Sequence, residues 1–292
     1  MKSDELVSIV VPTYNRSRSI GECLEGLLVQ SHRNLEIIIS DDNSSDRTVS
    51  IVTEFMRSDP RIKLIRTSIN SGPAGARNRG IKKARGDFIF FTDDDVVVSP
   101  DWISVGLRLF EDIECVGIEG EVIYVSSTYH PRYSDRVVSN RSGNNFMMAN
   151  MAYKKDVLFQ AGLLNESFRV MEDRDLALRV LKYGNIVFSK DFSVTHMREQ
   201  RTLKSFLLEA RGSATWVQFN LINKQRNRMV WFVYQPFKLL ALFFPPLIFS
   251  KYFTAEFKSP FDYLLLLALY PRLWYERILA WRWAIRYNKF MI

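Results

Sequence analysis

Cysteine and histidine are scarce in this sequence of 292 residues, which holds two of the first and three of the second. Two cysteines, Cys23 and Cys115, are too few for the disulfide framework of small secreted domains, although one bridge between them stays open. We therefore expect a reducing compartment. Residues 1–5 are polar and carry no apolar leader, so we also expect no signal peptide and a cytoplasmic catalytic body.

Glycine-rich phosphate loops are also missing. Neither G-x-x-x-x-G-K-[ST] nor G-x-G-x-x-G occurs, which excludes the two common ways of cradling phosphate on backbone amides. The chain is 25% charged and 47% hydrophobic, which excludes a disordered or collagen-like protein. This length leaves room for one large domain with an appendage, or for two small domains.

Positive charge is present but unevenly distributed. Residues 1–195 hold 25 basic and 27 acidic side chains, whereas residues 196–292 hold 15 and 5, so the formal surplus of +8 belongs to the final third. The same third carries 22 of the 39 aromatic residues. This distribution predicts a nearly neutral catalytic body followed by a basic, aromatic tail.

Short apolar runs alternate with helical patterns through the first hundred residues. The apolar runs cover residues 7–11, 35–39, 62–65 and 88–91. Segments long enough for helices lie between them, at about 18–30, 45–58 and 74–85. This alternation predicts an α/β fold with a Rossmann-like, mostly parallel twisted sheet flanked by helices. Sheets of this kind bind ligands beyond the carboxyl ends of their strands.

Acidic clusters follow two of the predicted strands. Asp41 and Asp42 come after the second strand, and Asp93, Asp94 and Asp95 come after the fourth. Adjacent carboxylates at the end of a buried strand repel one another, and a hard cation such as Mg²⁺ or Mn²⁺ relieves that repulsion. A solvated turn or a helix cap is the alternative at each cluster. Two such clusters at strand ends favour a metal-assisted site.

Several motifs, taken in order, resemble the family 2 glycosyltransferases, which have the GT-A fold. They are VSIVVPTYN at 7–15, QS at 30–31, EIII at 36–39, DDNSSD at 41–46, GPAGARNRG at 72–80 and DDD at 93–95. These segments look like the family's opening strand and nucleotide loop, its second strand, the segment before the metal motif and the D-x-D signature. The resemblance covers most of residues 6–197 and implies a GT-A catalytic domain at 1–197.

The resemblance implies a nucleotide-sugar donor, with a UDP-sugar favoured and a GDP- or dTDP-sugar as alternatives, and Mn²⁺ or Mg²⁺ as cofactor. The donor-binding residues that it implies are Pro12, Tyr14, Asn15, Asp41, Asp42, Arg77, Asp93 and Asp94. Asp95 is the first choice as metal ligand because Pro100 follows at the family's usual distance, and Asp93 is the second. Arg77 either assists the diphosphate or pairs with a carboxylate, since its fork suits both.

The acceptor side is expected in the second half of this domain. Residues 150–156 resemble the strand that enters the acceptor half, and GLLNE at 162–166 departs from the commoner GGFDE. Glu172 and Asp173 resemble the family's E-D motif at the start of a helix. Asp173 is therefore expected to be the catalytic base of an inverting transfer, kept ionised by the helix dipole, with Glu172 as the competing residue. The alternative is that both only stabilise the helix turn.

His196 lies where histidine in family members contacts the metal or the diphosphate, so it joins Asp93 and Asp95 as a predicted metal ligand. His32 and His130 have no comparable context. A surface or hydrogen-bonded histidine is the alternative at position 196.

The tail is expected to contact a membrane. We predict a helical connection at 198–228 and apolar, basic, aromatic membrane-associated helices at 229–292. Residues 230–249 are long enough to cross a bilayer, but three prolines and Lys238 favour an interfacial or re-entrant element. Residues 261–270 are too short to span.

The last segment has the pattern of an amphipathic helix. Trp274, Ile278, Trp281 and Ile285 share one helical face, and Arg272, Glu276, Arg282 and Arg286 gather on the other, with Arg277 as the exception. Such helices lie at the headgroups of an anionic membrane surface. Packing on the body of the protein or on another subunit is the alternative, because amphipathicity alone does not distinguish lipid from core.

Together these features predict a metal-dependent, inverting glycosyltransferase acting on a saccharide or lipid-linked saccharide, peripheral or monotopic at the cytoplasmic face of the cell membrane. A sugar nucleotidyltransferase is one alternative, although the N-terminal region lacks a glycine-rich basic loop for a triphosphate. A non-catalytic basic binding protein is the other. We expect no nucleic acid as partner, because binding along a backbone needs exposed charge more than continuous apolar surface.

Overall fold

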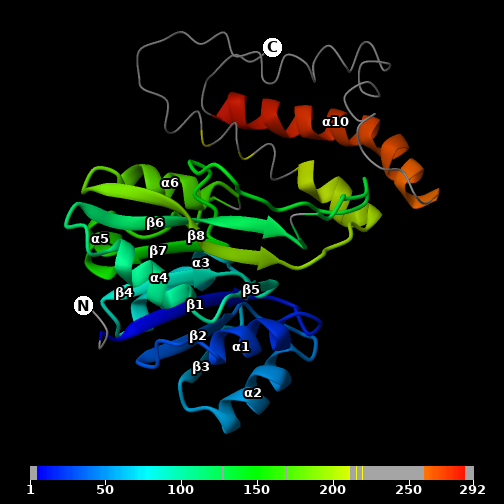
Figure 1. Cartoon of the computed structure of the whole chain (residues 1–292). Helices are drawn as coiled ribbons and strands as arrows, with labels where there is room; N and C mark the ends of the chain where they lie inside the picture. Colours follow the sequence, from blue (N-terminus) through cyan, green and yellow to red (C-terminus); the bar gives the residue numbers. More distant parts are fainter. Residues whose placement is uncertain are drawn as a thin grey trace. The chain divides into compact units, whose positions relative to one another are not determined.

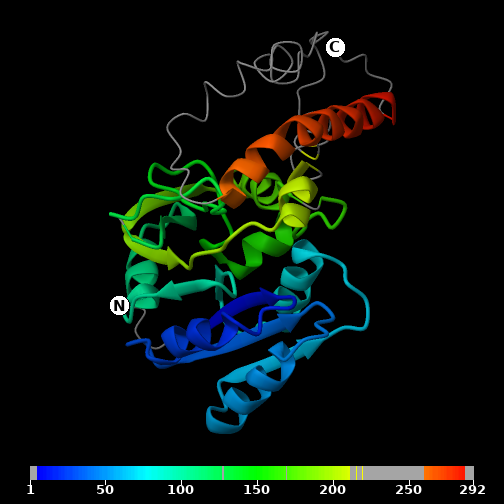
Figure 2. The same cartoon turned by 90° about the vertical axis from the view of Figure 1, so that its right-hand side faces the viewer.

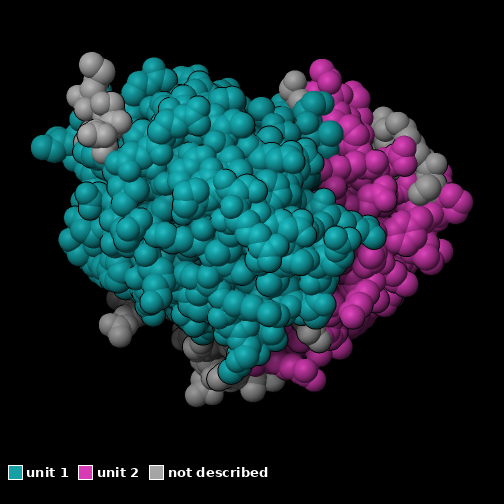
Figure 3. Space-filling model, turned by 90° about the horizontal axis from the view of Figure 1, so that it is seen from below, with its two compact units in different colours: residues 1–127, 138–197 teal, residues 128–137, 198–292 magenta. Residues whose placement is uncertain are grey.

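The computed structural model describes residues 5–126, 128–168, 170–210, 215, 219 and 260–286. The chain divides into two compact units, coloured separately in Figure 3. The first comprises residues 1–127 and 138–197, and the second comprises residues 128–137 and 198–292. Segment 128–137 therefore belongs with the C-terminal part of the chain, although it lies within the sequence range of the first unit.

The first unit is built on one sheet, which has eight strands among the described residues, in the order β3-β2-β1-β4-β7-β6-β8-β5 (Figure 1). The strands are β1 (Val7–Thr13), β2 (Leu35–Asp41), β3 (Ile62–Arg66), β4 (Phe88–Thr92), β5 (Val96–Val98), β6 (Cys115–Tyr124), β7 (Asn150–Lys154) and β8 (Asn185–His196). The four strands expected from the apolar runs are all present, each ending within two residues of its predicted limit.

Most strand pairs are parallel, as predicted. β1 pairs in parallel with β2 and β4, β2 with β3, and β6 with β8. The exceptions are β7, which is antiparallel to both β4 and β6, and β5, which is antiparallel to β8. The carboxyl ends of β1, β2 and β4 therefore meet at one edge of the sheet, and β7 begins at that edge, with Asn150 opposite Thr92.

Helices cover both faces of this sheet (Figure 2). They are α1 (Ile20–Leu28), α2 (Thr48–Ser58), α3 (Pro73–Lys83), α4 (Trp102–Leu109), α5 (Lys155–Gln160) and α6 (Glu172–Val180). The first three confirm the helices expected at 18–30, 45–58 and 74–85. Because α6 begins at Glu172, the predicted E-D motif does open a helix.

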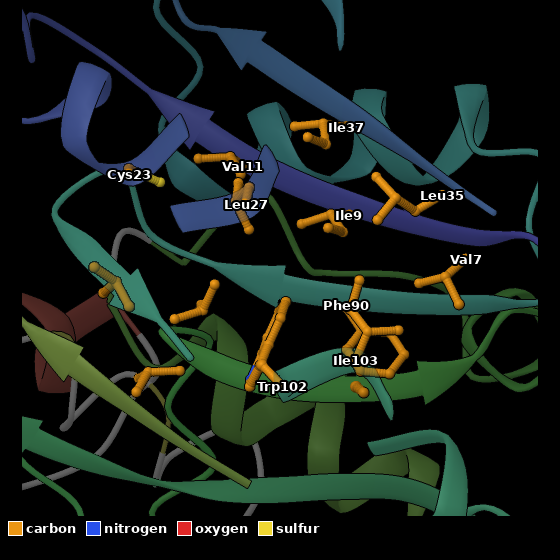
Figure 4. Close-up of a cluster of buried hydrophobic side chains, with 14 of the residues drawn as sticks. Val7, Ile9, Val11, Cys23, Leu27, Leu35, Ile37, Phe90, Trp102 and Ile103 are labelled. Carbon is orange, nitrogen blue, oxygen red and sulfur yellow. The ribbon is translucent and has the colours of Figure 1, made fainter. Parts of the chain in front are cut away.

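Two hydrophobic clusters fill the space between the sheet and its helices. Side chains alternate across a strand, so Val7, Ile9 and Val11 face the cluster under α1, α2 and α4, while Val10 faces the one under α3, α5 and α6. Figure 4 shows the first cluster around Trp102. Trp102 stacks on Phe192 with ring centroids 5.3 Å apart, which ties α4 to the sheet. Both cysteines are buried and unbridged, which confirms the expected lack of a disulfide framework.

The second unit contains α10 (Pro260–Arg286), one helix of 27 residues that continues through Pro271, and a helix at 203–210. The segment 261–270 and the amphipathic segment from Arg272 to Arg286, which the sequence suggested as separate elements, are thus parts of one helix. Its core joins Leu265, Leu269 and Leu273 to Tyr133 and Phe206. Among the residues described, no helix combines the length and apolar character needed to cross a bilayer.

The structure describes only parts of the predicted tail. The segment 230–249 lies outside the described residues, and so do residues 211–214, 216–218 and 220–228 of the predicted connection at 198–228. Of the predicted range 229–292, the described part is α10, and Ile285 and Arg286 lie in it without described side chains.

Candidate active site

The loops after β1 and β2 are tied together at the shared sheet edge. Asn15 has a positive φ of 55°, which asparagine tolerates better than most residues. Its backbone N–H donates to Ser44 Oγ at 2.9 Å, and its Oδ1 accepts the N–H of Ser45 at 2.8 Å. Pro12 is partly buried in β1, and the side chain of Tyr14 is 48% exposed. The predicted nucleotide loop therefore has a fixed backbone and an accessible aromatic ring.

Asp41 and Asp42 are neighbours with different surroundings. The carboxylate of Asp41 is buried, accepts the N–H of Ser44 at 3.1 Å and lies 3.5 Å from Arg66 Nε. Asp42 accepts the N–H of Gly72 at 2.7 Å and Arg79 Nη2 at 2.6 Å. Burial opposes ionisation of Asp42, but bonds from the Ser71 N–H, Arg79 and the Gly72 N–H outweigh it and lower its pKa. Asp42 thus anchors the loop that leads into α3.

The aspartate triplet after β4 is crowded. Asp94 and Asp95 are buried, and Arg16 lies between them, with Nε 3.3 Å from Asp94 and Nη2 3.4 Å from Asp95. Burial raises the pKa of Asp94 to about 8; Arg16 opposes this shift, and Asp95 and Asp93 add to it. The repulsion that the sequence indicated is therefore present in the fold.

His196, the last residue of β8, is brought against Asp95, with Nε2 3.3 Å from Asp95 Oδ1. Its Nδ1 lies 2.9 Å from the carbonyl of Met197, which can only accept, so Nδ1 carries the hydrogen. In neutral histidine the Nε2 lone pair then faces a carboxylate oxygen, and this arrangement requires a proton or a cation. Asp95 and His196 thus fit a divalent cation as two ligands, with phosphate and water oxygens completing its shell.

The third predicted metal ligand points elsewhere. Asp93 Oδ1 accepts Arg77 Nη2 at 2.6 Å rather than meeting His196. Within the described residues, no three or more His, Cys, Asp and Glu side chains are grouped so as to hold a metal by themselves. Metal binding by Asp93, Asp95 and His196 stays a prediction.

Arg77 joins two acidic groups that lie far apart in the sequence. Its side chain comes from α3, is almost fully buried, and contacts Asp93 after β4 at 2.6 Å and Glu172 of α6 at 3.1 Å. Burial opposes the charge on Arg77, but Asp93 and Glu172 outweigh burial and raise its pKa. Of the two roles that the sequence left open, carboxylate pairing is the one observed here, and contact with a diphosphate stays a prediction.

The pair Glu172 and Asp173 opens α6 after Met171, whose φ of 75° is unusual for a long side chain. Burial raises the pKa of Glu172, Asp173 adds to that shift, and Arg77 opposes it. Burial also raises the pKa of Asp173, against the N–H of Arg174 and the charge of Arg77. Asp173 accepts the N–H of Arg174 at 2.7 Å and forms no ion pair with any described residue. Among the described residues, therefore, Glu172 has a direct ion-pair partner and Asp173 has none.

Three residues of this region were not predicted. Arg16 pairs with Asp94 and Asp95, and Arg79 pairs with Asp42. The excess of carboxylates in the sequence was a sign that nearby arginines would be needed.

The third is Tyr153 of β7, which has a buried hydroxyl with no hydrogen-bond partner among the described residues. Burial raises its pKa well above the usual range, and Asp173 and Glu119 raise it further. Nothing in the sequence distinguished it from an ordinary core tyrosine.

Residues 8–164 match the family model for glycosyl transferase family 2. An uncharacterized glycosyltransferase of Haemophilus influenzae is 26% identical over 227 residues, which cover 76% of this chain and 83% of that protein. The UDP-Glc:alpha-D-GlcNAc-diphosphoundecaprenol beta-1,3-glucosyltransferase of Escherichia coli is 42% identical over 106 residues, or 36% of this chain and 40% of that enzyme. This chain thus aligns with less than half the length of the second relative.

A solved mannosyltransferase from Pyrobaculum calidifontis, in complex with GDP-Man and Mn²⁺, has a similar structure. Its TM-score is 0.60 at 18% identity, over 97% of this chain and 85% of that one. This likeness shows the GT-A fold, which agrees with the mixed sheet and with the acidic strand ends described above. The ordered motifs and the family match over more than half of the sequence agree with it, and the chain is a glycosyltransferase that belongs to glycosyl transferase family 2.

Proposed function

We propose that this chain transfers a sugar, with inversion, from a nucleotide-sugar donor to the hydroxyl of an acceptor saccharide, and that it requires Mn²⁺ or Mg²⁺. The observation that carries the proposal is the double contact of Arg77. One guanidinium connects the aspartate triplet after β4 to the carboxylate pair that opens α6. The proposed donor side and acceptor side are thereby held at a fixed separation, which a transfer between two bound substrates needs.

The donor lies over the edge where β1, β2 and β4 end. Tyr14 and Pro12 offer apolar surface to the base, and Asp41 and Asn15 border the same loops. A UDP-sugar is the favoured donor, because the Escherichia coli relative with 42% identity is named for UDP-Glc. The Pyrobaculum mannosyltransferase was solved with GDP-Man, so a GDP-sugar is the second choice.

Asp95 and His196 would hold the cation, and Asp93 would remain paired with Arg77 beside them. The bound cation would neutralise charge that develops on the leaving diphosphate. Arg16, which contacts Asp94 and Asp95, adds positive charge at the same place. Asp94 and Asp42 contribute by holding the two loops in position.

Asp173 is the proposed base. It accepts the proton of the acceptor hydroxyl while that oxygen forms a bond to the anomeric carbon. The bond from this carbon to the diphosphate breaks, and its electron pair leaves with the diphosphate oxygen, so attack from the opposite side inverts the configuration. The contact of Glu172 with Arg77 favours Asp173 as the base, because Glu172 is buried with its Oε1 already engaged by Arg77, whereas Asp173 is only partly buried.

We place the reaction at the cytoplasmic face of the cell membrane, on a lipid-linked saccharide used in polysaccharide or glycolipid assembly. The Escherichia coli relative is named for a diphosphoundecaprenol acceptor, which is a membrane lipid. The basic and aromatic final third of this chain suits an anionic surface.

The proposal is tested with a panel of nucleotide sugars and the full-length protein. We expect release of a nucleoside diphosphate without pyrophosphate, loss of transfer on chelation, and recovery with Mn²⁺ or Mg²⁺. Asp95→Ala and Asp173→Asn should each abolish transfer, whereas Asp191→Asn, at an exposed position on β8, should not. Anomeric proton couplings of the product report inversion. Unchanged transfer in Asp95→Ala or Asp173→Asn, or a retained configuration, would contradict the assigned roles.

A further inference from the structure

The helix α10 is apolar on two faces. Its inner face packs Leu265, Leu269 and Leu273 against Tyr133 and Phe206. Its outer face carries a second stripe, which we call the outer stripe. Its members and their exposed fractions are Leu264 at 46%, Leu267 at 70%, Trp274 at 36%, Ile278 at 42% and Trp281 at 40%. A helix that is apolar on both sides is expected in a surrounding that covers both.

Several charged residues of α10 are buried, unlike those of an ordinary surface helix. Asp262, Glu276 and Arg277 are at most 3% exposed. Asp262 accepts the N–H of Ser134 at 2.9 Å, and Arg272 pairs with Glu209 at 3.0 Å. The helix therefore turns these charges toward its own unit and apolar side chains outward, which is costly in water.

The outer stripe is continuous. Its members follow one another at intervals of three, seven, four and three residues, which places them on one side of an α-helix. From Leu264 to Trp281 the stripe is about 25 Å long at the rise of an α-helix. Figure 1 shows α10 as one unbroken helix, so the stripe lies on a single continuous element.

The composition of the stripe and its setting favour lipid as its cover. Its two tryptophans both lie in the C-terminal half of the stripe, and the exposed Arg282 follows Trp281, a combination suited to the headgroup region. The final third of the chain carries 15 basic against 5 acidic residues, which complements an anionic surface. A spanning orientation would bring Arg272, Glu276 and Arg277 into hydrocarbon, so an orientation parallel to the surface is the one compatible with these charges.

We propose that the outer stripe of α10 is the membrane-docking face of this chain, lying parallel to an anionic bilayer at headgroup depth. This docking role rests on the proposed function only in that a lipid-linked acceptor requires a membrane nearby. The docking role goes further because it names the side chains that enter the lipid.

The test is flotation of the full-length protein with vesicles of phosphatidylcholine and phosphatidylglycerol. Leu267→Ser, Trp274→Ser and Ile278→Ser are combined in one variant. A matched variant combines Ile69→Ser, Ile113→Ser and Phe159→Ser, which are 72%, 88% and 47% exposed in the first unit. We expect the stripe variant to lower vesicle partitioning at least about tenfold, because three apolar side chains that would enter the lipid are lost. The matched variant should change vesicle partitioning less than about twofold.

Equal partitioning of wild type and stripe variant would overturn the proposal. A dimeric wild type and a monomeric stripe variant in light scattering, with equal vesicle binding, would also overturn it. The stripe would then be covered by a second copy of this chain. Weaker binding to pure phosphatidylcholine vesicles is expected, and no preference for the anionic vesicles would contradict the electrostatic part.

Failure of the docking face and failure of the proposed reaction are distinguishable. The stripe variant should keep slow hydrolysis of the donor in the absence of membranes, which also shows that it is folded. Asp173→Asn should float like wild type while losing transfer. A stripe variant that floats like wild type and keeps donor hydrolysis would contradict the docking role while leaving the proposed reaction unaffected.

Discussion

At the scale of single residues, Arg77 is the side chain whose shape matters most. Its contacts with Asp93 and Glu172 use two arms of the planar guanidinium group. Lysine would keep the positive charge but has no such planar fork. Arg77→Lys should therefore lower kcat/KM for transfer by about 10- to 100-fold, because one charge-assisted hydrogen bond is lost and its free energy corresponds to a change of that size. Arg85→Lys, at a side chain that is 67% exposed, is the matched control and should stay within about twofold. Transfer by Arg77→Lys at the control level would show that the bridge is dispensable.

We expect the loss of transfer activity at low pH to reflect protonation of Asp173. A base must be ionised to accept a proton, and burial raises the pKa of Asp173 above its ordinary value of about 4. Activity is therefore present above the raised pKa and is lost as the pH falls through it. As the pH is lowered, we expect kcat/KM to begin falling at a pH well above about 4. A profile that stays flat down to that pH, in enzyme shown to be folded by circular dichroism, would exclude Asp173 as the base.

At the scale of elements, Glu36 of β2 connects three strands at the sheet edge opposite the site. It accepts Ser8 Oγ of β1 at 2.7 Å, Lys63 Nζ of β3 at 2.5 Å and the N–H of Arg85 at 2.6 Å. Burial opposes ionisation of Glu36, but Lys63, Arg85 and Ser8 outweigh it and lower its pKa to about 2. Its contribution to stability is thus present above the unfolded pKa of about 4.3 and is lost as the pH falls toward 2.

Glu36→Gln should cost about 2 to 4 kcal/mol in the free energy of unfolding at neutral pH, because partners are left unsatisfied. The difference from wild type should shrink as the pH is lowered from about 5 toward 2, since wild-type Glu36 is then protonated. Urea unfolding at several pH values measures both effects. The exposed Glu54 of α2 gives the control, and Glu54→Gln should be nearly neutral. A cost that does not vary with pH would contradict the ionic role of Glu36.

Among the elements, β1 to β4 and the three helices between them were predictable, because apolar runs and helical spacing are local properties of the chain. The direction of β7 was not, since an apolar run reads alike in a parallel or an antiparallel strand. The acidic residues after β2 and β4 were found because charge at a strand end is a local signal. The contact of Arg77 with Glu172 lies beyond such signals, because it joins residues that only the folded sheet brings together.

At the scale of the whole molecule, the second unit is assembled from two separate stretches of chain. Within it, Asp135 is fully buried and accepts Tyr129 Oη at 2.7 Å and Arg198 Nε at 3.0 Å. A chain ending after Met197 would lose Arg198, Phe206 and α10 together. We expect hydrogen exchange of the amides in 128–137 to increase sharply in that truncated chain, while exchange in β1 and β2 stays slow. Unchanged protection of 128–137 would show that this segment is held by other contacts.

The reversed strand β7 also affects how the protein can change during evolution. β6 and β4 run the same way and β7 runs against both, so the chain leaves the sheet after Tyr124 and returns at Asn150 on the same edge. Residues 125–149 therefore form an excursion whose two ends are fixed by the sheet. Lengthening such a loop adds little closure entropy and leaves every strand register intact. This excursion can therefore change in length and composition while the strands, and the side chains at their carboxyl ends, stay where they are.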